Sequence, residues 1–308
     1  MNKKYINVLD LIGNTPCLKI DGIYVKQEFL NPSGSIKDRI AKYIVEKAER
    51  SGKLKKGYTI IEATTGNTGI AFSMVASIKE YKMIVVMPQG LSEEREEIIR
   101  SYGAEIHFVK QGCVTCAVDY ARKLARKPKF FMPNQFSNNW NIEENEKILG
   151  KEILKQVENI DAFVAGVGTG GTLIGVGKAI KKKFPKAKLF AVEPNECPVI
   201  SESGIGPLKG ITKSSICKRH RIEGIGDGFV PKLIKDNKKL IDYIIRVRSD
   251  DAINETKRIA RDHGLLVGIS SGANLLVARR LKLAYKNIVT VFPDTGSRYL
   301  SEHYFKNF

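Results

Sequence analysis

The chain has 308 residues and a mass of 34.3 kDa, which favours one large domain or two of ordinary size. Hydrophobic residues make up 43% and charged residues 27%, a globular balance that argues against disorder. The formal net charge is +18, but the cationic residues are scattered, so solvated surface lysines are favoured over a nucleic-acid site. The sequence shows neither an apolar run long enough to span a membrane nor a secretory signal, so we expect a cytoplasmic protein without a membrane partner.

Strand and helix signals alternate along most of the chain. Expected strands cover residues 24–29, 59–63, 82–88, 105–109, 162–167, 189–192, 243–247 and 288–292, with another near 130. Helical spacing appears at 36–48, at 69–79 and after Ser92. The alternation predicts a doubly wound α/β architecture with mostly parallel sheets. Residues 195–230 are the least regular stretch, and a loop region of that length is more often functional than idle.

The most conspicuous glycine-rich turn covers residues 164–172, between a strand and a helix. Its backbone N–H groups at a helix N-terminus would cradle a phosphate, and two threonines would add hydroxyls. The same turn satisfies G-x-G-x-x-G through Gly166, Gly168 and Gly171, with Glu193 at the spacing of a ribose-binding acid. An NAD-dependent oxidoreductase therefore stays open on this motif alone.

A second turn, at residues 62–69, groups three threonines and Asn67 around two glycines at a helix start. Hydroxyls, an amide and free N–H groups suit a carboxylate. A third turn, at 267–273, is a weaker signal. Lys37 follows a turn and the natural N-cap Ser35. The helix dipole and partial burial would lower the pKa of this lysine and leave a nucleophilic amine, although an exposed helix lysine is the simpler interpretation.

Five cysteines, an odd number, do not predict a disulfide scaffold. Cys113 and Cys116 form a C-x-x-C pair where a helix is expected to begin. A redox pair is one interpretation, but two half-buried helix residues are favoured. Four dispersed histidines give no metal-ligand spacing, so no metal is expected.

Together these segments resemble the pyridoxal-phosphate enzymes of the cysteine synthase and cystathionine β-synthase group, which have the tryptophan synthase β-like fold. The matching motifs occur in family order at residues 12–16, 31–39, 64–69, 168–172, 223–229, 268–272 and 293–296. The resemblance implies two doubly wound, three-layer α/β/α domains and a homodimer. Residues 1–40 and 144–308 would form the large cofactor-binding domain, and residues 41–143 a small mobile domain that closes over the substrate.

The resemblance also implies residue roles. Lys37 would carry pyridoxal phosphate as a Schiff base and then take the α-proton. Asn67 would bond the ring hydroxyl, and Ser270 would face the pyridine nitrogen. The phosphate would be held by Gly168, Thr169, Gly170, Gly171 and Thr172. The substrate, through its carboxylate above all, would be bound by Thr64, Thr65, Asn67, Thr68, Gln135 and Gly224. An NAD enzyme would leave Lys37 and Ser270 unused, so it becomes a distant alternative.

A serine at the ring nitrogen favours loss of a β-substituent and an α-aminoacrylate intermediate. We therefore expect β-replacement on a serine-derived amino acid with sulfide or a thiol, of the cysteine synthase (O-acetylserine sulfhydrylase) type. Asp227 departs from the small apolar residue usual in sulfhydrylases. As a base for water or thiol, it would favour an enzyme that consumes cysteine and releases sulfide, forming serine, lanthionine or cystathionine. A plain loop cap is equally favoured. The cluster Lys218, Arg219 and Arg221 is either an anion site or ordinary surface charge.

Overall fold

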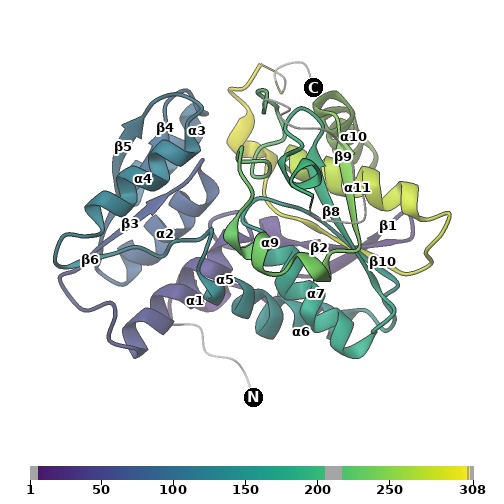
Figure 1. Ribbon diagram of the computed structural model, residues 1–308, viewed down its shortest axis with the longest axis horizontal. Coiled ribbons are helices and arrows are strands. Elements are labelled where there is room, and N and C mark those ends of the chain that lie inside the picture. The colour runs from purple at the N-terminus through teal and green to yellow at the C-terminus, as the bar shows by residue number, and fades with distance from the viewer. Residues whose placement is uncertain (1–5, 205–216, 304, 306–308) are drawn as a thin grey trace. The chain divides into compact units, whose positions relative to one another are not determined.

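Two separate sheets organise the chain, and each belongs to its own unit (Figure 1). The computed structural model describes residues 6–204, 217–303 and 305. Unit 1 takes its residues from Met1–Asn14, Phe29–Gln135 and Arg298–Asn307, and unit 2 from Thr15–Glu28 and Phe136–Ser297. The sequence predicted domain boundaries near residues 40 and 143. They delimit a domain expected to close over the substrate, and they stay a prediction.

Unit 1 contains a parallel sheet in the order β5-β4-β3-β6. Its strands are β3 (Thr59–Ala63), β4 (Lys82–Pro88), β5 (Glu105–Val109) and β6 (Phe130–Phe131). Its α-helices are α1 (Lys37–Arg50), α2 (Asn67–Ile78), α3 (Glu93–Ser101) and α4 (Val114–Leu124). Helices α2 and α4 pack on the strands, and α1 packs on α2. The buried stripe of α1, which includes Ile40, Ile44 and Ala48, recurs at helical spacing and explains that packing.

Unit 2 contains a six-stranded sheet in the order β1-β2-β10-β7-β8-β9, antiparallel only between β1 and β2. Its strands are β1 (Cys17–Ile20), β2 (Ile23–Gln27), β7 (Ala162–Gly166), β8 (Lys188–Pro194), β9 (Tyr243–Val247) and β10 (Ile288–Phe292). Its α-helices are α5 (Asn139–Glu144), α6 (Gly150–Gln156), α7 (Gly171–Lys183), α8 (Val199–Glu202), α9 (Lys232–Asp236), α10 (Ser249–His263) and α11 (Ile269–Leu281). A π-helical segment, Asn145–Leu149, joins α5 to α6.

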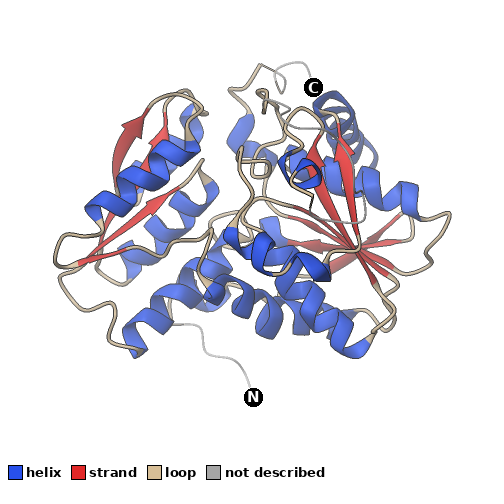
Figure 2. Ribbon diagram, in the orientation of Figure 1, coloured by secondary structure: helices blue, strands red, loops and turns tan. Residues whose placement is uncertain are grey.

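Helices cover both faces of the large sheet, with α10 and α11 on one side and α5, α6 and α7 on the other (Figures 1 and 2). The central strand β7 is buried over Ala162–Ala165, as expected for a strand covered on both faces. Two α/β units with sheets enclosed by helices confirm the predicted fold class. In the part of the chain that the structure describes, no helix has the length and apolar character to cross a bilayer.

Each sheet reverses its winding at one point. In unit 1 the strand order runs from β3 through β4 to β5, and β6 then returns to the other side of β3. In unit 2 β8 and β9 lie to one side of β7, whereas β10 lies on the other. Such reversals leave a crevice outside the carboxyl ends of the parallel strands, where ligands of α/β proteins bind. The turns after β3 and β7 are the two glycine-rich turns singled out in the sequence.

Candidate functional site

The turn after β3 gathers the predicted carboxylate-binding residues of unit 1. Gln135 follows β6, which pairs with β3, so it meets the turn at the sheet's point of reversal. Thr68 donates a hydrogen bond from Oγ1 to Gln135 Oε1 at 2.7 Å, and Gln135 Nε2 donates to Ala63 O at 2.8 Å. Thr64 Oγ1 accepts from the Gly66 amide at 2.9 Å, and Thr65 is partly exposed. The threonines therefore border one polar turn at the N-terminus of α2.

Glu62, the residue before this turn, is a fully buried acid that sequence reasoning did not single out. Its Oε1 accepts the amide of Ala63 at 3.0 Å, and its Oε2 accepts the amide of Gln135 at 3.2 Å. Burial raises the pKa of Glu62 to about 8, although its backbone hydrogen bonds act in the opposite direction. This carboxyl ties β3 and the segment after β6 together beneath the threonine turn.

Two buried arginines support the same turn from distant parts of the sequence. Arg95 donates from Nη1 to Thr65 O at 2.8 Å and packs where a Cβ on Gly66 would stand. Gly66 has φ +145°, which L-residues rarely adopt, so both backbone shape and space require glycine. Arg298 donates from Nη1 to Oδ1 of Asn67, the first residue of α2. Arg298 therefore orients the amide of a predicted cofactor residue.

Lys37 lies in the first turn of α1, as the sequence predicted, and is half-buried, but the N-cap is Ile36 and not the predicted Ser35, so the helix begins one residue later than expected. The Lys37 backbone N–H donates to Ser35 Oγ at 3.3 Å, while the preceding turn is fixed by the Ser33 amide donating to Asp38 at 2.7 Å. Burial is the main cause of the raised pKa of Tyr102; the carboxylate of Asp38 also raises this pKa, and the guanidinium of Arg298 lowers it. Asp38 lies in the first turn of α1, and Arg298 bonds Asn67 at the start of α2. Charged groups at the two helix starts therefore interact with the same tyrosine in unit 1.

The glycine turn of unit 2 leads from β7 into the 13-residue helix α7. A Cβ on Gly168 would overlap Gly224 O, and one on Gly171 would overlap Asn141 Oδ1. Gly170 has the left-handed φ of +86°. The first N–H groups of α7 lie outside the helical ladder, and the positive end of the helix dipole faces the turn. A turn closed to Cβ atoms but rich in N–H donors fits the phosphate of pyridoxal phosphate.

Asn141 is a partner of this turn that sequence reasoning missed. Its Nδ2 donates to Thr169 Oγ1 at 3.0 Å, and the same oxygen accepts the Gly171 amide at 3.3 Å. Asn141 lies in α5. Nothing local in the sequence connected it to Thr169, which follows 28 residues later. Thr172 follows Gly171 in the first turn of α7.

The segment 224–229 lies directly against the glycine turn. The Gly226 amide donates to Val167 O at 3.1 Å. Asp227 Oδ2 stands 3.8 Å from the point that a Cβ on Gly168 would occupy. Asp227 is partly exposed, so a carboxylate and the predicted substrate residue Gly224 both border the candidate phosphate site.

Helix α11 lies beside the carboxyl end of β7. Ser270 is buried in its first turn. Further along, Asn274 Nδ2 donates to Val291 O at 2.9 Å, and its Oδ1 is 3.3 Å from a Cβ position on Gly166. Among the described residues, Asn274 Oδ1 and Ser271 Oγ are buried without a hydrogen-bond partner. The unsatisfied Asn274 Oδ1 lies beside Gly166 at the end of β7, which is consistent with a polar ligand there.

Two other sequence signals have structural explanations. The carboxylate of Glu193 accepts the amides of Ile200 at 2.9 Å and Ser201 at 3.2 Å, so it caps α8 rather than standing free for a ribose. Arg221 pairs with Asp250, while Lys218 and Arg219 are exposed.

The favoured interpretation of the cysteines is wrong. Cys113 and Cys116 form a disulfide, and Cys113 caps α4 instead of lying inside it. A second disulfide joins Cys197 and Cys217, which leaves Cys17 free. Because a pairing depends on which segments the fold brings together, spacing alone did not reveal the second bond.

Comparisons with known proteins agree with this geometry. The model of the pyridoxal-phosphate dependent enzyme family matches residues 8–294. A cysteine synthase of Staphylococcus aureus (strain Mu50) is 42% identical over 96% of this chain and 95% of its own. The crystal structure of O-ureido-L-serine synthase has a TM-score of 0.89 at 33% identity, covering 99% of this chain and 96% of that one.

A third relative is a hydrogen sulfide-producing enzyme of Fusobacterium nucleatum. Its crystal structure has a TM-score of 0.86 at 41% identity, covering 96% of this chain and 90% of that one. The chain belongs to the pyridoxal-phosphate dependent enzyme family. The predictions of a β-replacing enzyme and of pyridoxal phosphate as its cofactor are confirmed, and the NAD alternative falls.

Proposed function

We propose that this enzyme is a cysteine synthase that replaces the acetate of O-acetyl-L-serine with sulfide. The observation that carries the proposal is the division of anion sites between two helix N-termini. The start of α2 presents hydroxyls and an amide suited to a substrate carboxylate, and the start of α7 presents a glycine turn suited to a phosphate. The whole-chain identity to a cysteine synthase supports the same donor and nucleophile.

Within this proposal, Lys37 would hold the cofactor covalently and, once the substrate amine has taken its place, would accept the proton from the substrate Cα. Pyridoxal phosphate, when bound, supplies an electron-withdrawing ring that makes this proton removable. Asn67, held by Arg298, would hydrogen-bond the ring hydroxyl, and Ser270 would face the ring nitrogen. The N–H groups of residues 168–172 would hold the phosphate.

The substrate carboxylate is bound by the hydroxyls of Thr64, Thr65 and Thr68, by Asn67, and by N–H groups at the start of α2. The dipole of α2 favours a negative charge at this position. Gln135 would bind the carboxylate directly, and its Oε1 accepts a hydrogen bond from Thr68 Oγ1, whose single hydrogen the substrate carboxylate would take over. Gly224 would border the substrate, because its carbonyl oxygen lies against Gly168 in the glycine turn while the space beside its own Cα is open. We further propose a cytoplasmic homodimer that works without nucleic acid.

A second candidate function follows from Asp227. A carboxylate beside the glycine turn is placed to deprotonate water or a thiol, and this favours a cysteine-consuming, sulfide-releasing reaction. The whole-chain cysteine synthase relative favours the first function. Asp227→Asn separates them, since the first predicts that O-acetyl-L-serine and sulfide still react, and the second predicts loss of sulfide release from L-cysteine.

The visible absorbance of the purified holoenzyme tests the proposal. Adding O-acetyl-L-serine without sulfide should change the cofactor spectrum, and adding sulfide should restore it. Lys37→Ala should abolish both changes, whereas Lys56→Ala, at an exposed position, should leave them intact. A holoenzyme whose spectrum ignores O-acetyl-L-serine but responds to L-cysteine would replace the first function with the second.

A further inference from the structure

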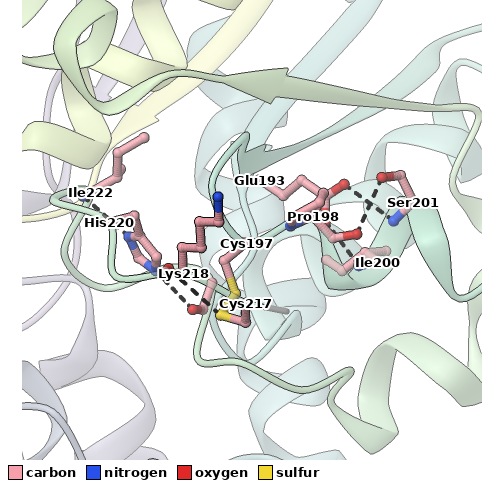
Figure 3. The surroundings of a disulfide bond; sticks show 10 residues. Glu193, Cys197, Pro198, Ile200, Ser201, Cys217, Lys218, His220 and Ile222 are labelled. Carbon is pink, nitrogen blue, oxygen red and sulfur yellow. Dashed lines mark hydrogen bonds between the residues drawn. A yellow bond between two sulfur atoms is a disulfide. The ribbon is translucent and has the colours of Figure 1, made fainter. Parts of the chain in front are cut away.

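The disulfide Cys197–Cys217 joins the segment after β8 to the segment that leads into residues 224–229 (Figure 3). The bond spans 20 residues of sequence. Beside it, the Lys218 amide donates to Glu196 O at 2.9 Å. Cys197 is fully buried against the end of β8, so this side of the bond is a fixed anchor. Cys217 is exposed and is the side that the bond restrains.

From Cys217 the restraint reaches residues 224–229 through direct contacts. A Cβ on Gly228 would stand 3.7 Å from Cys217 Sγ. His220 Nε2 donates to Gly226 O at 2.9 Å, while its Nδ1 accepts the Ile222 amide at 3.3 Å. The carbonyl partner of Nε2 and the amide partner of Nδ1 favour the tautomer with its hydrogen on Nε2. His220 therefore links the disulfide-bonded segment to the loop that carries Asp227.

The same loop is held against the glycine turn and against Phe136. The Gly226 amide donates to Val167 O at 3.1 Å, and Phe229 packs edge-on against Phe136 with ring centroids 5.0 Å apart. Gly224, Gly226 and Gly228 all have positive φ, so the loop backbone gains much conformational freedom when its anchors weaken. Release of Cys217 would remove one of those anchors.

We propose that Cys197–Cys217 is a reversible redox modification site, reduced by a dithiol, which controls how tightly the loop 224–229 holds the amino-acid substrate. The inference rests on the proposed function, because it assigns the substrate to that loop. A dithiol thiolate attacks the exposed Cys217 Sγ, the S–S bond breaks, and Cys197 leaves as a thiolate that takes a proton. The second thiol then attacks the mixed disulfide, which frees Cys217 and yields the oxidised dithiol.

The chemical setting supports reversibility. In a reducing cytoplasm, protein disulfides are usually transient and act as redox sensors. The other disulfide, Cys113–Cys116, caps α4 in unit 1, whereas the loop belongs to unit 2. That pair therefore serves as a matched control, because it has the same chemistry at a position outside the loop.

The first experiment compares oxidised and dithiothreitol-reduced holoenzyme, with thiol alkylation and mass spectrometry to count the bonded cysteines. The readout is the O-acetyl-L-serine concentration that gives half of the absorbance change, measured without sulfide because sulfide itself attacks disulfides. Reduction should raise this concentration at least about fivefold, the lower end of typical coupling between a remote change and a binding site. The cofactor should stay bound.

Variants assign the effect. Cys217→Ser should keep the raised value in both redox states, and Cys197→Ala provides a second test if that variant fails to fold. The double variant Cys113→Ser/Cys116→Ser should switch like the wild type. Equal values in the two redox states, or switching that survives in Cys217→Ser, would overturn the proposal.

Amide hydrogen exchange provides a readout that does not depend on the proposed function. Peptides covering residues 218–229 should exchange faster in the reduced holoenzyme, while peptides of β7 should not change. If O-acetyl-L-serine gives no spectral change in either state, the proposed donor is wrong, but this exchange comparison still decides whether the disulfide restrains the loop. Unchanged exchange over 218–229 would overturn the inference by itself.

Discussion

Glu62 should make the stability of the enzyme fall as the pH rises through neutrality. The pKa of this buried carboxyl is about 8, against 4.5 for an ordinary glutamate. Between these values the folded protein holds a proton that the unfolded chain has lost, so the free energy of unfolding decreases with rising pH. At 1.36 kcal/mol for each pKa unit, the loss is at most about 5 kcal/mol when the titration is complete. That is a large part of the net stability of a typical domain.

Urea unfolding of the holoenzyme at pH 5 and pH 9 measures this effect, with Glu62→Gln as the test variant. At pH 5 the variant should be less stable by about 1–3 kcal/mol, because one amide N–H now faces the side-chain NH₂ group. At pH 9 it should equal or exceed the wild type, which by then carries a buried charge. The exposed Glu97→Gln serves as a control for the loss of one acid. A difference between wild type and Glu62→Gln that is the same at both pH values would refute this reasoning.

Three other perturbations test separate parts of the account. Gly168→Ala should lower cofactor retention, seen as visible absorbance per protein after dialysis, since the new Cβ overlaps the backbone oxygen of Gly224; full retention would contradict the close fit of the turn. Thr68→Val should raise the O-acetyl-L-serine concentration at half-saturation about tenfold, which is the equivalent of about 1.4 kcal/mol for one lost hydrogen bond. The control Ser73→Ala loses only a hydrogen bond to Gly69 O within α2, so it should affect stability alone. Reduction of Cys197–Cys217, which spans 20 residues, should lower the free energy of unfolding by about 3 kcal/mol. Cys217→Ser, in which dithiothreitol can reduce only Cys113–Cys116, should lose less stability than the wild type on adding dithiothreitol.

The sequence predicted strands well where an apolar run is bounded by turn residues. Strands β3, β4, β5, β9 and β10 occupy the predicted ranges. It missed β1, a four-residue strand with two exposed positions. The signal for β1 was the Asp21-Gly22 pair, whose φ angles of +48° and +81° make the tight turn to β2. Helix α2 begins at Asn67 rather than near 69, because Gly66 ends the turn earlier than the apolar spacing indicates.

The residues of the candidate site fall into two groups, those with a local sequence signal and those without one. Lys37, the threonine turn and the glycine turn each carry a local signal, because each joins a strand or loop to a helix start. Their partners carry none. Arg298 reaches Asn67 from 231 residues away, and Gln135 reaches Glu62 from 73. Such pairs depend on how the fold brings distant segments together, and short-range sequence patterns do not predict these contacts.

The direct test of the central claim is the stoichiometry of the complete reaction. Holoenzyme supplied with O-acetyl-L-serine and sulfide should form cysteine and acetate in equal amounts, and Lys37→Ala should form neither above the uncatalysed rate. This result would establish the substrate pair and the role of Lys37 together. Acetate release without cysteine, or no reaction with O-acetyl-L-serine while L-cysteine is consumed with release of sulfide, would contradict it.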